Sequence, residues 1–154
     1  MVIRAMETRD YRAYCALLSE VHGMHAGNRP DIFKEVLVLP GEADFSQMIS
    51  DEKCVCLAAE ADGEVVGMCL MEIRMPRAAH VHHRQIGYID DLCVRSDMRG
   101  RGIGSKLYEA MKERARELGL VRMELMVWAF NERAKRFYER LGMNVRSCTM
   151  EERL

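Results

Sequence analysis

Residues 94–104 read Val-Arg-Ser-Asp-Met-Arg-Gly-Arg-Gly-Ile-Gly and join an apolar strand to a helix. Glycines alternate at Gly100, Gly102 and Gly104, and three arginines lie among them or just before them. Because glycine adopts positive φ and lets the backbone approach a ligand closely, such a turn leaves amide N–H groups free to bind an anion. The positive end of the helix dipole strengthens that attraction. The stretch therefore predicts a loop that binds a pyrophosphate.

The spacing of this loop separates it from two other phosphate-binding loops. A Walker loop has Lys and then Ser or Thr directly after its last glycine, whereas Gly104 is followed by Ser105 and then Lys106. A dinucleotide fingerprint has a wider gap before its third glycine and an acidic residue at the end of the next strand. Glu124 instead lies inside the next apolar run. Both alternatives are excluded.

Arg99-x-x-Gly102-x-Gly104 resembles the acyl-CoA pyrophosphate loop of the GNAT superfamily of N-acyltransferases. A second segment supports the resemblance. Residues 131–143 contain Asn-x-x-Ala-x-x-Phe-Tyr followed by Leu-Gly-Met, similar to the second CoA-binding segment of that superfamily, with Met143 in place of the usual Phe. The resemblance spans roughly residues 86–145, and the first half of the chain matches only in its order of elements.

The second segment also has the pattern of a capped helix. Four apolar residues are spaced i, i+3, i+4 and i+7, which places them on one helix face: Ala134, Phe137, Tyr138 and Leu141. Asn131 is a favourable N-cap residue, and Gly142 is favourable just after the last turn. We expect a helix bounded by these two residues.

Periodicity and turn signals predict the order β-α-α-β-β-β-α-β-α-β. The expected strands are 2–5, 54–61, 64–75, 86–94, 121–128 and 144–152, and the expected helices begin at Thr8 or Asp10, near Phe45, at Gly102 and at Asn131. Asp62-Gly63 predicts a hairpin, and residues 22–41 predict a loop with a short helix. The resemblance implies an α/β GNAT fold, with a mixed six- to seven-stranded sheet and helices on both faces, formed by residues 1–154 as a single domain.

The resemblance implies acetyl-CoA as co-substrate and assigns residues to it. In that fold the strand before the loop and the strand after the helix splay apart, and the pantetheine arm lies between them. The expected cofactor-binding residues are Leu92, Cys93, Val94, Arg99, Gly100, Arg101, Gly102, Ile103, Gly104, Ser105, Asn131, Ala134 and Tyr138.

Transfer of an acetyl group to an amine needs a base, because a lysine-like amine is protonated near pH 7. Asp90 and Asp91 precede the strand section expected to touch the acetyl group, and strict alternation would point only one of them into the pocket. Asp90 matches the glutamate of related acetyltransferases and is the expected base, directly or through water, with Glu72 in reserve. Tyr138 matches the tyrosine that protonates the departing thiolate.

Two other features have simpler interpretations. Cys93 points away from the expected face of Asp90, so it is interpreted as a core residue, and direct transfer is favoured over an acetyl-cysteine intermediate. His80, His82 and His83 have no carboxylate or cysteine at ligand spacing, so no metal site is predicted. Residues 22–42 and 76–85 are the least patterned, and we expect acceptor specificity there.

The composition excludes other classes of protein. With 154 residues and a net charge of −1, the chain has no broad basic surface for nucleic acid or an anionic membrane. No apolar run reaches the ~18 residues of a membrane span. Six scattered cysteines without a Cys-x-x-Cys pair are typical of a reduced, cytoplasmic protein.

The sequence thus predicts an N-acetyltransferase that moves an acetyl group from acetyl-CoA to a primary amine of a small molecule or a protein. The alternative is a non-catalytic module that binds or senses acyl-CoA. A homodimer formed through the last strands, as in many superfamily members, is a further hypothesis.

Overall fold

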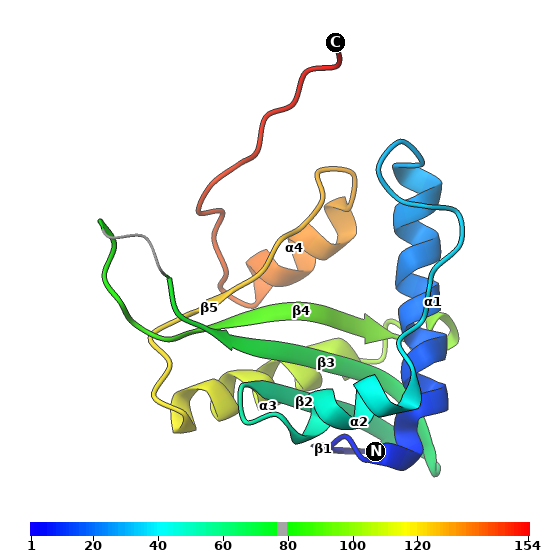
Figure 1. The fold of residues 1–154 in the computed structure, drawn as a ribbon. Helices are drawn as coiled ribbons and strands as arrows, with labels where there is room; N and C mark the ends of the chain where they lie inside the picture. The colour runs from blue at the N-terminus through cyan, green and yellow to red at the C-terminus, as the bar shows by residue number, and fades with distance from the viewer. Residues whose placement is uncertain (77–79) are drawn as a thin grey trace.

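The computed structural model describes residues 1–76 and 80–154, and Figure 1 shows a sheet with helices on both of its faces. The strands are β1 (Val2–Ala5), β2 (Cys54–Ala61), β3 (Glu64–Arg74), β4 (Ile86–Val94) and β5 (Met123–Glu124). The helices are α1 (Tyr11–Asn28), α2 (Glu42–Ser50), α3 (Ile103–Glu117) and α4 (Glu132–Arg140), with 3-10 turns η1 (Thr8–Asp10) and η2 (Ser96–Met98). The α/β class and the mixed sheet are confirmed.

The sheet has the order β1-β2-β3-β4-β5, so neighbours in space are also neighbours in sequence. The first four strands pair antiparallel, and β5 pairs parallel with β4 after the crossover through α3. The β2-β3 hairpin turns at Asp62 and Gly63, which have φ values of 54° and 81°. Positive φ at both positions matches the twist of the flanking strands, as the Asp-Gly signal predicted.

Each face of the sheet supports its own hydrophobic cluster. On one face α3 buries Leu107 and Met111 completely, together with Cys69 and Val66 of β3. On the other face α1 and α2 bury Leu17 and Phe45 against Met68 and other side chains. The helices therefore cover both faces, which leaves the end of the sheet at β4 and β5 to form a site.

The strand count is lower than predicted, because the predicted strand 144–152 is not formed and β5 has two residues instead of eight. Residues 144–154 extend away from the body in Figure 1, and each of them is exposed. Ion pairs hold this segment: Arg146 with Glu124, Glu151 with Arg29, and Arg153 with Asp31. Alternating side chains form a strand only beside a partner edge, and the two residues of β5 provide too short an edge.

Helix α1 is longer than predicted, since it continues through residues 22–28 to Asn28. Within the described part of the chain, no helix has the length and apolar content needed to cross a bilayer. Residues 77–79 of the expected acceptor segment 76–85 lie outside the described residues.

Leu107→Ala should lower the free energy of unfolding by about 2–5 kcal/mol, because Leu107 is 0% exposed and the deletion leaves a cavity between α3 and the sheet. Val36→Ala is the control, since Val36 is 74% exposed. Chemical denaturation measures both values, and equal effects of the two variants would contradict the assigned core.

Candidate active site

The loop between β4 and α3 has the backbone that its glycines predicted. Gly100 and Gly102 have φ values of 79° and 77°, in the left-handed region. A Cβ added at either position would meet no other atom within 4 Å, so the backbone conformation rather than lack of space requires glycine. The two left-handed residues lie between η2 and the first residue of α3, Ile103.

The first residues of α3 line a cleft at the surface of the protein. Among the described residues, no side chain caps the N-cap residue Gly102, and the first turn of α3 has no acidic residue. The first amides of α3 and the helix dipole thus present partial positive charge to the same spot. An anion such as a diphosphate satisfies both features.

Gly104 has a different role from the two glycines before it. A Cβ at this position would lie 3.3 Å from the Phe137 ring, so the glycine allows α4 to pack closely on the first turn of α3. The alternating glycines therefore divide into two that shape the loop and one that brings the two predicted CoA-binding segments together.

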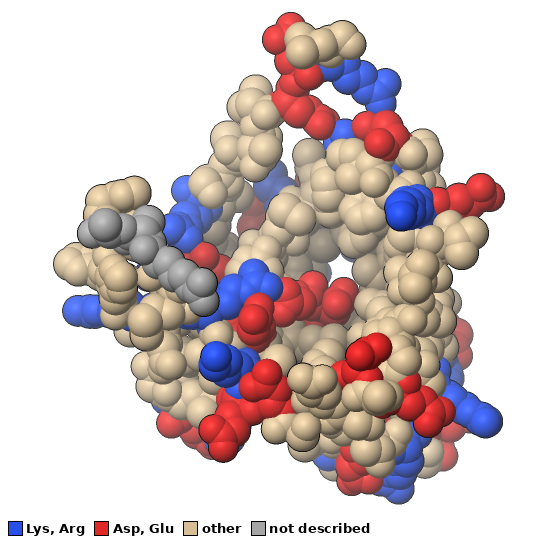
Figure 2. Space-filling view, viewed as in Figure 1, with Lys and Arg blue, Asp and Glu red and all other residues tan. Residues whose placement is uncertain are grey.

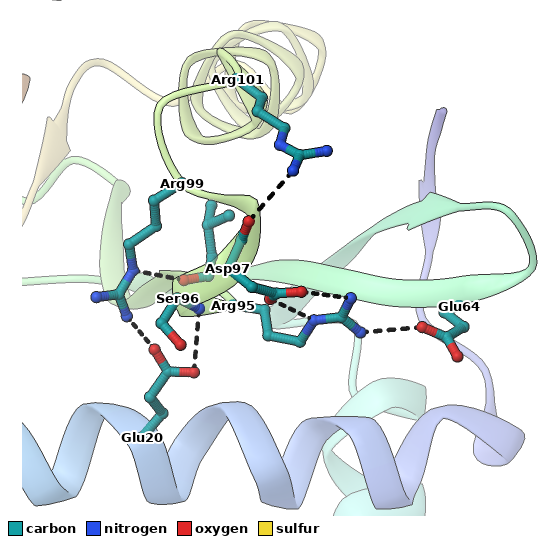
Figure 3. A network of polar contacts seen from close by, with 8 residues as sticks. Glu20, Glu64, Arg95, Ser96, Asp97, Arg99 and Arg101 are labelled. Carbon is teal, nitrogen blue, oxygen red and sulfur yellow. Dashed lines mark hydrogen bonds and ion pairs between the residues drawn. The ribbon is translucent and has the colours of Figure 1, made fainter.

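The arginines of the loop bind protein groups, as Figure 3 shows. Arg95 pairs with Asp97 and with Glu64, at 2.7 and 3.0 Å. Arg99 pairs with Glu20 of α1 and donates to the carbonyl of Val94 at 2.8 Å. The charges of Arg95 and Arg99 are therefore paired with carboxylates of the protein, and these ion pairs hold the loop against α1 and β3.

A cleft of about 730 Å³ opens in front of this loop. Its walls come from β4, the chain after β5, the first turn of α3, α4 and the second half of α1. Figure 2 shows the hollow between α4 and α1, with acidic side chains below it. The cleft lies between β4 and the chain after β5, where the resemblance implied that two strands splay apart.

Almost all predicted site residues line this cleft. They are Asp90, Leu92, Cys93, Val94, Arg99, Gly100, Gly102, Ile103, Gly104, Ser105, Asn131, Ala134 and Tyr138. Arg101 does not line it, and its guanidinium donates instead to the carbonyl of Asp97 at 3.4 Å. Arg101 lies between Gly100 and Gly102 in the sequence, but successive residues of a loop point in different directions, so it does not share their surface.

Helix α4 has the predicted caps. The Asn131 side chain accepts a hydrogen bond from the amide of Ala134 at 3.1 Å, and Gly142 has a φ of 90°. This frame directs Tyr138 into the cleft beside Phe137, with ring centroids 5.0 Å apart. Burial raises the pKa of the Tyr138 phenol, so it is protonated near neutral pH and available as a proton donor.

The aspartate pair differs from the prediction, because β4 contains a bulge. Leu70 of β3 pairs with Asp91 but the next residue, Met71, pairs with Ile89, so Asp90 is an additional residue in β4. An extra residue interrupts the alternation of side chains. Both aspartates consequently line the cleft, and the prediction that only one would do so is wrong.

Asp90 is bound to an arginine that the sequence did not single out. Arg74 donates to Asp90 at 2.7 Å and to Glu72 at 2.5 Å, and its guanidinium lies 3.8 Å from the centroid of the Tyr88 ring. Burial raises the pKa of Asp90 while Arg74 opposes that shift. Glu72, the reserve base, is not among the residues that line the cleft.

Cys93 is among the residues that line the cleft, but its side chain is buried. Its sulfur lies 3.7 Å from the carbonyl oxygen of Leu17. Burial raises the pKa of its thiol to about 11, which leaves little of the nucleophilic thiolate.

His80, His82 and His83 are exposed and do not line the cleft. The described residues contain no group of three or more His, Cys, Asp or Glu side chains arranged for a metal ion.

An aromatic cluster at the end of α1 was missed by the sequence analysis. His25 stacks on Phe33 at 5.1 Å, and Phe33 meets the edge of Trp128 at 5.3 Å. Phe130 lies 6.2 Å from Trp128, so the cluster links α1 to the segment before α4. The continued 3.6-residue spacing of Val21, Met24 and His25 was the available signal for this longer helix.

The fold thus brings the glycine loop before α3 and the Tyr138 side chain of α4 to one cleft, the arrangement that the sequence resemblance implied. The model of the acetyltransferase (GNAT) family matches residues 21–143. The chain therefore belongs to the GNAT family.

Particular relatives agree with this assignment. The chain is 36% identical over 94 residues to an uncharacterized N-acetyltransferase of Archaeoglobus fulgidus, covering 61% of this chain and 63% of the relative. It is 40% identical over 99 residues to the aminoalkylphosphonate N-acetyltransferase of Salmonella typhimurium, covering 64% of this chain and 62% of the relative. These matches span a little under two thirds of each relative. A crystal structure of a BH1408 mutant from Bacillus halodurans superposes with a TM-score of 0.94 at 31% identity, covering 100% of this chain and 99% of the other.

Asn131→Ala should lower the free energy of unfolding by about 1 kcal/mol, because it removes the cap of α4. Asn144→Ala, an exposed position outside the helices, should have almost no effect. Chemical denaturation of both variants checks this, and a similar loss in each would show that the cap contributes nothing.

Proposed function

We propose that this protein is an acetyl-CoA-dependent N-acetyltransferase that transfers the acetyl group directly to a primary amine. The observation that carries the proposal is that one cleft is lined both by the uncapped N-terminus of α3 and by Tyr138, Asp90 and Asp91. An anion site alone would suit many nucleotides. The proton donor and acceptors in the same cleft add the groups that acyl transfer needs.

The residues present fit coenzyme A. The open amides at the start of α3 would hold its diphosphate, and Leu92 to Val94 would offer backbone groups to the pantetheine arm, with Asn131 and Ala134 on the opposite wall. Acetyl-CoA supplies an activated thioester. A backbone N–H of β4 directed at the thioester oxygen would stabilise the negative charge that develops there during attack.

The catalytic groups proposed from this chain are an aspartate of the pair Asp90 and Asp91 as base, directly or through water, and Tyr138 as acid. The base takes a proton from the acceptor ammonium, and Tyr138 protonates the sulfur as the carbon–sulfur bond breaks. The raised pKa of Tyr138 keeps its proton on the oxygen until a thiolate forms nearby. The relative from Salmonella is named for aminoalkylphosphonate acetylation, so small amines with an anionic group are among the first acceptors to test.

Incubation of the protein with acetyl-CoA and a panel of amines, 2-aminoethylphosphonate included, tests the proposal. Free thiol and the mass of the product are followed together, because six free cysteines of the protein also react with thiol reagents. We expect acetylated amine in step with released thiol. Binding of acetyl-CoA without transfer to any amine would favour the non-catalytic module instead.

Tyr138→Phe should lower kcat at least about tenfold while the Kd for acetyl-CoA changes less than about threefold, because only the proton donor is lost. Tyr108→Phe is the matched control, since Tyr108 is buried, lies 6.2 Å from the Tyr138 ring and does not line the cleft. Steady-state kinetics and calorimetry measure the two quantities. Equal losses in kcat and affinity would assign Tyr138 to binding.

The cytoplasmic location and the homodimer stay predictions of the sequence. Sedimentation velocity tests the second: a species of twice the chain mass supports it, and the 17.7 kDa chain alone contradicts it.

A further inference from the structure

The two aspartates of β4 are unequal, although they are neighbours and both line the cleft. The bulge is the reason, because it turns two successive side chains toward the same space instead of to opposite faces. Their surroundings then decide which of them is free to exchange a proton.

Asp90 is occupied by an ion pair. Its carboxylate accepts from Arg74 at 2.7 Å, and Arg74 is in turn fixed by Glu72 and by the ring of Tyr88. To accept a proton, Asp90 would have to weaken a charge-assisted hydrogen bond that favours its ionised form. Asp90 also remains 39% exposed through its side chain, so it lies at the rim of the cleft.

Asp91 lies deeper and has no such partner. Within residues 1–76 and 80–154, no hydrogen bond or ion pair to its carboxylate is found, and the residue is half-buried. Burial raises the pKa of Asp91, and the charge of Asp90 raises it further. A carboxylate with these surroundings binds a proton more readily than an ordinary aspartate.

The position of Asp91 relative to the proton donor supports the same choice. Burial is the main cause that raises the pKa of Tyr138 of α4 and that raises the pKa of Tyr14 of α1 to about 12, and the charge of Asp91 adds to both shifts. The titratable groups whose charges interact with that of Asp91 are Tyr14, Cys69, Asp90, Cys93 and Tyr138. Base and acid must flank one reacting carbon atom, and Asp91 and Tyr138 line the same cleft.

We infer that Asp91, rather than its neighbour Asp90, is the general base that deprotonates the acceptor amine, an assignment that rests on the proposed acetyl transfer. Asp91 takes one proton from the ammonium, and the nitrogen lone pair forms the new bond to the carbonyl carbon. The carbon–sulfur bond breaks with its electron pair on sulfur, which receives the proton of Tyr138. The second nitrogen proton returns to the Tyr138 oxygen through water, and Asp91 releases its proton to solvent.

Asp91→Asn and Asp90→Asn test this inference as a matched pair, because each removes one negative charge from neighbouring positions with little change in shape. With the amine of the panel that the wild type acetylates fastest, Asp91→Asn should lower kcat/KM at pH 7 by about 100-fold or more. Asp90→Asn should lower it by less than about tenfold. Each variant loses one negative charge that would attract the acceptor ammonium, so this effect is common to both and cancels when the two variants are compared.

The pH profile separates a base from a merely structural residue. Without a base, the rate of Asp91→Asn depends on amine that is already neutral, and it should rise about tenfold per pH unit between pH 7 and 9. The wild type and Asp90→Asn should rise less, because their base removes the proton. Titration of the variants with acetyl-CoA and their thermal unfolding report whether they fold, and Asp91→Ser replaces Asp91→Asn if that variant does not.

The outcomes distinguish the inference from the function on which it rests. If the wild type acetylates no amine, the proposed function fails. If the wild type is active and Asp91→Asn keeps its rate, or if Asp90→Asn shows the larger loss and the steeper pH profile, the assignment of Asp91 is overturned while the acetyltransferase function stands.

Discussion

The amide groups at the start of α3 have no side-chain cap among the described residues, so they find their partners in water or in a bound anion, and the proposed site is built around them. Gly100 and Gly102 hold left-handed conformations in the loop directly before α3. Gly104 then lets Phe137 approach, which brings α4 and Tyr138 to the same cleft. A helix N-terminus left without partners in the protein is favourable only where a ligand or water completes it.

The loop stays in place because its charges are paired with distant parts of the chain. Glu20 of α1 binds Arg99 and accepts a hydrogen bond from the amide of Ser96 at 3.3 Å, while Glu64 of β3 binds Arg95. Figure 3 shows these contacts on the side of the loop that faces α1 and the β2-β3 hairpin. Exposed pairs contribute little stability singly, but several on one short loop restrict its conformations. Helix α1 thereby connects the loop between β4 and α3 to the aromatic cluster at His25.

The sequence predicted those features that depend on local chemistry. The Asp62-Gly63 hairpin, the bounds of β2 and β4, the Asn131 cap and the cleft residues after β4 follow from turn residues, periodicity and a specific motif. Features that depend on partners far apart in the chain were missed. The bulge at Asp90 arises from pairing with β3, and the ion pair between Arg74 and Asp90 joins the neighbouring strands β3 and β4. The segment after residue 143 has no strand edge to join. A one-residue bulge reverses which side chains share a face, and alternation alone does not reveal it.

The most direct measurement is a calorimetric comparison of coenzyme A with pantetheine, which lacks the diphosphate and the nucleotide. If the amides at the start of α3 hold the diphosphate, coenzyme A binds and pantetheine binds at least about 100-fold more weakly. Equal affinities of the two compounds, or no binding of coenzyme A to folded protein, would contradict the account.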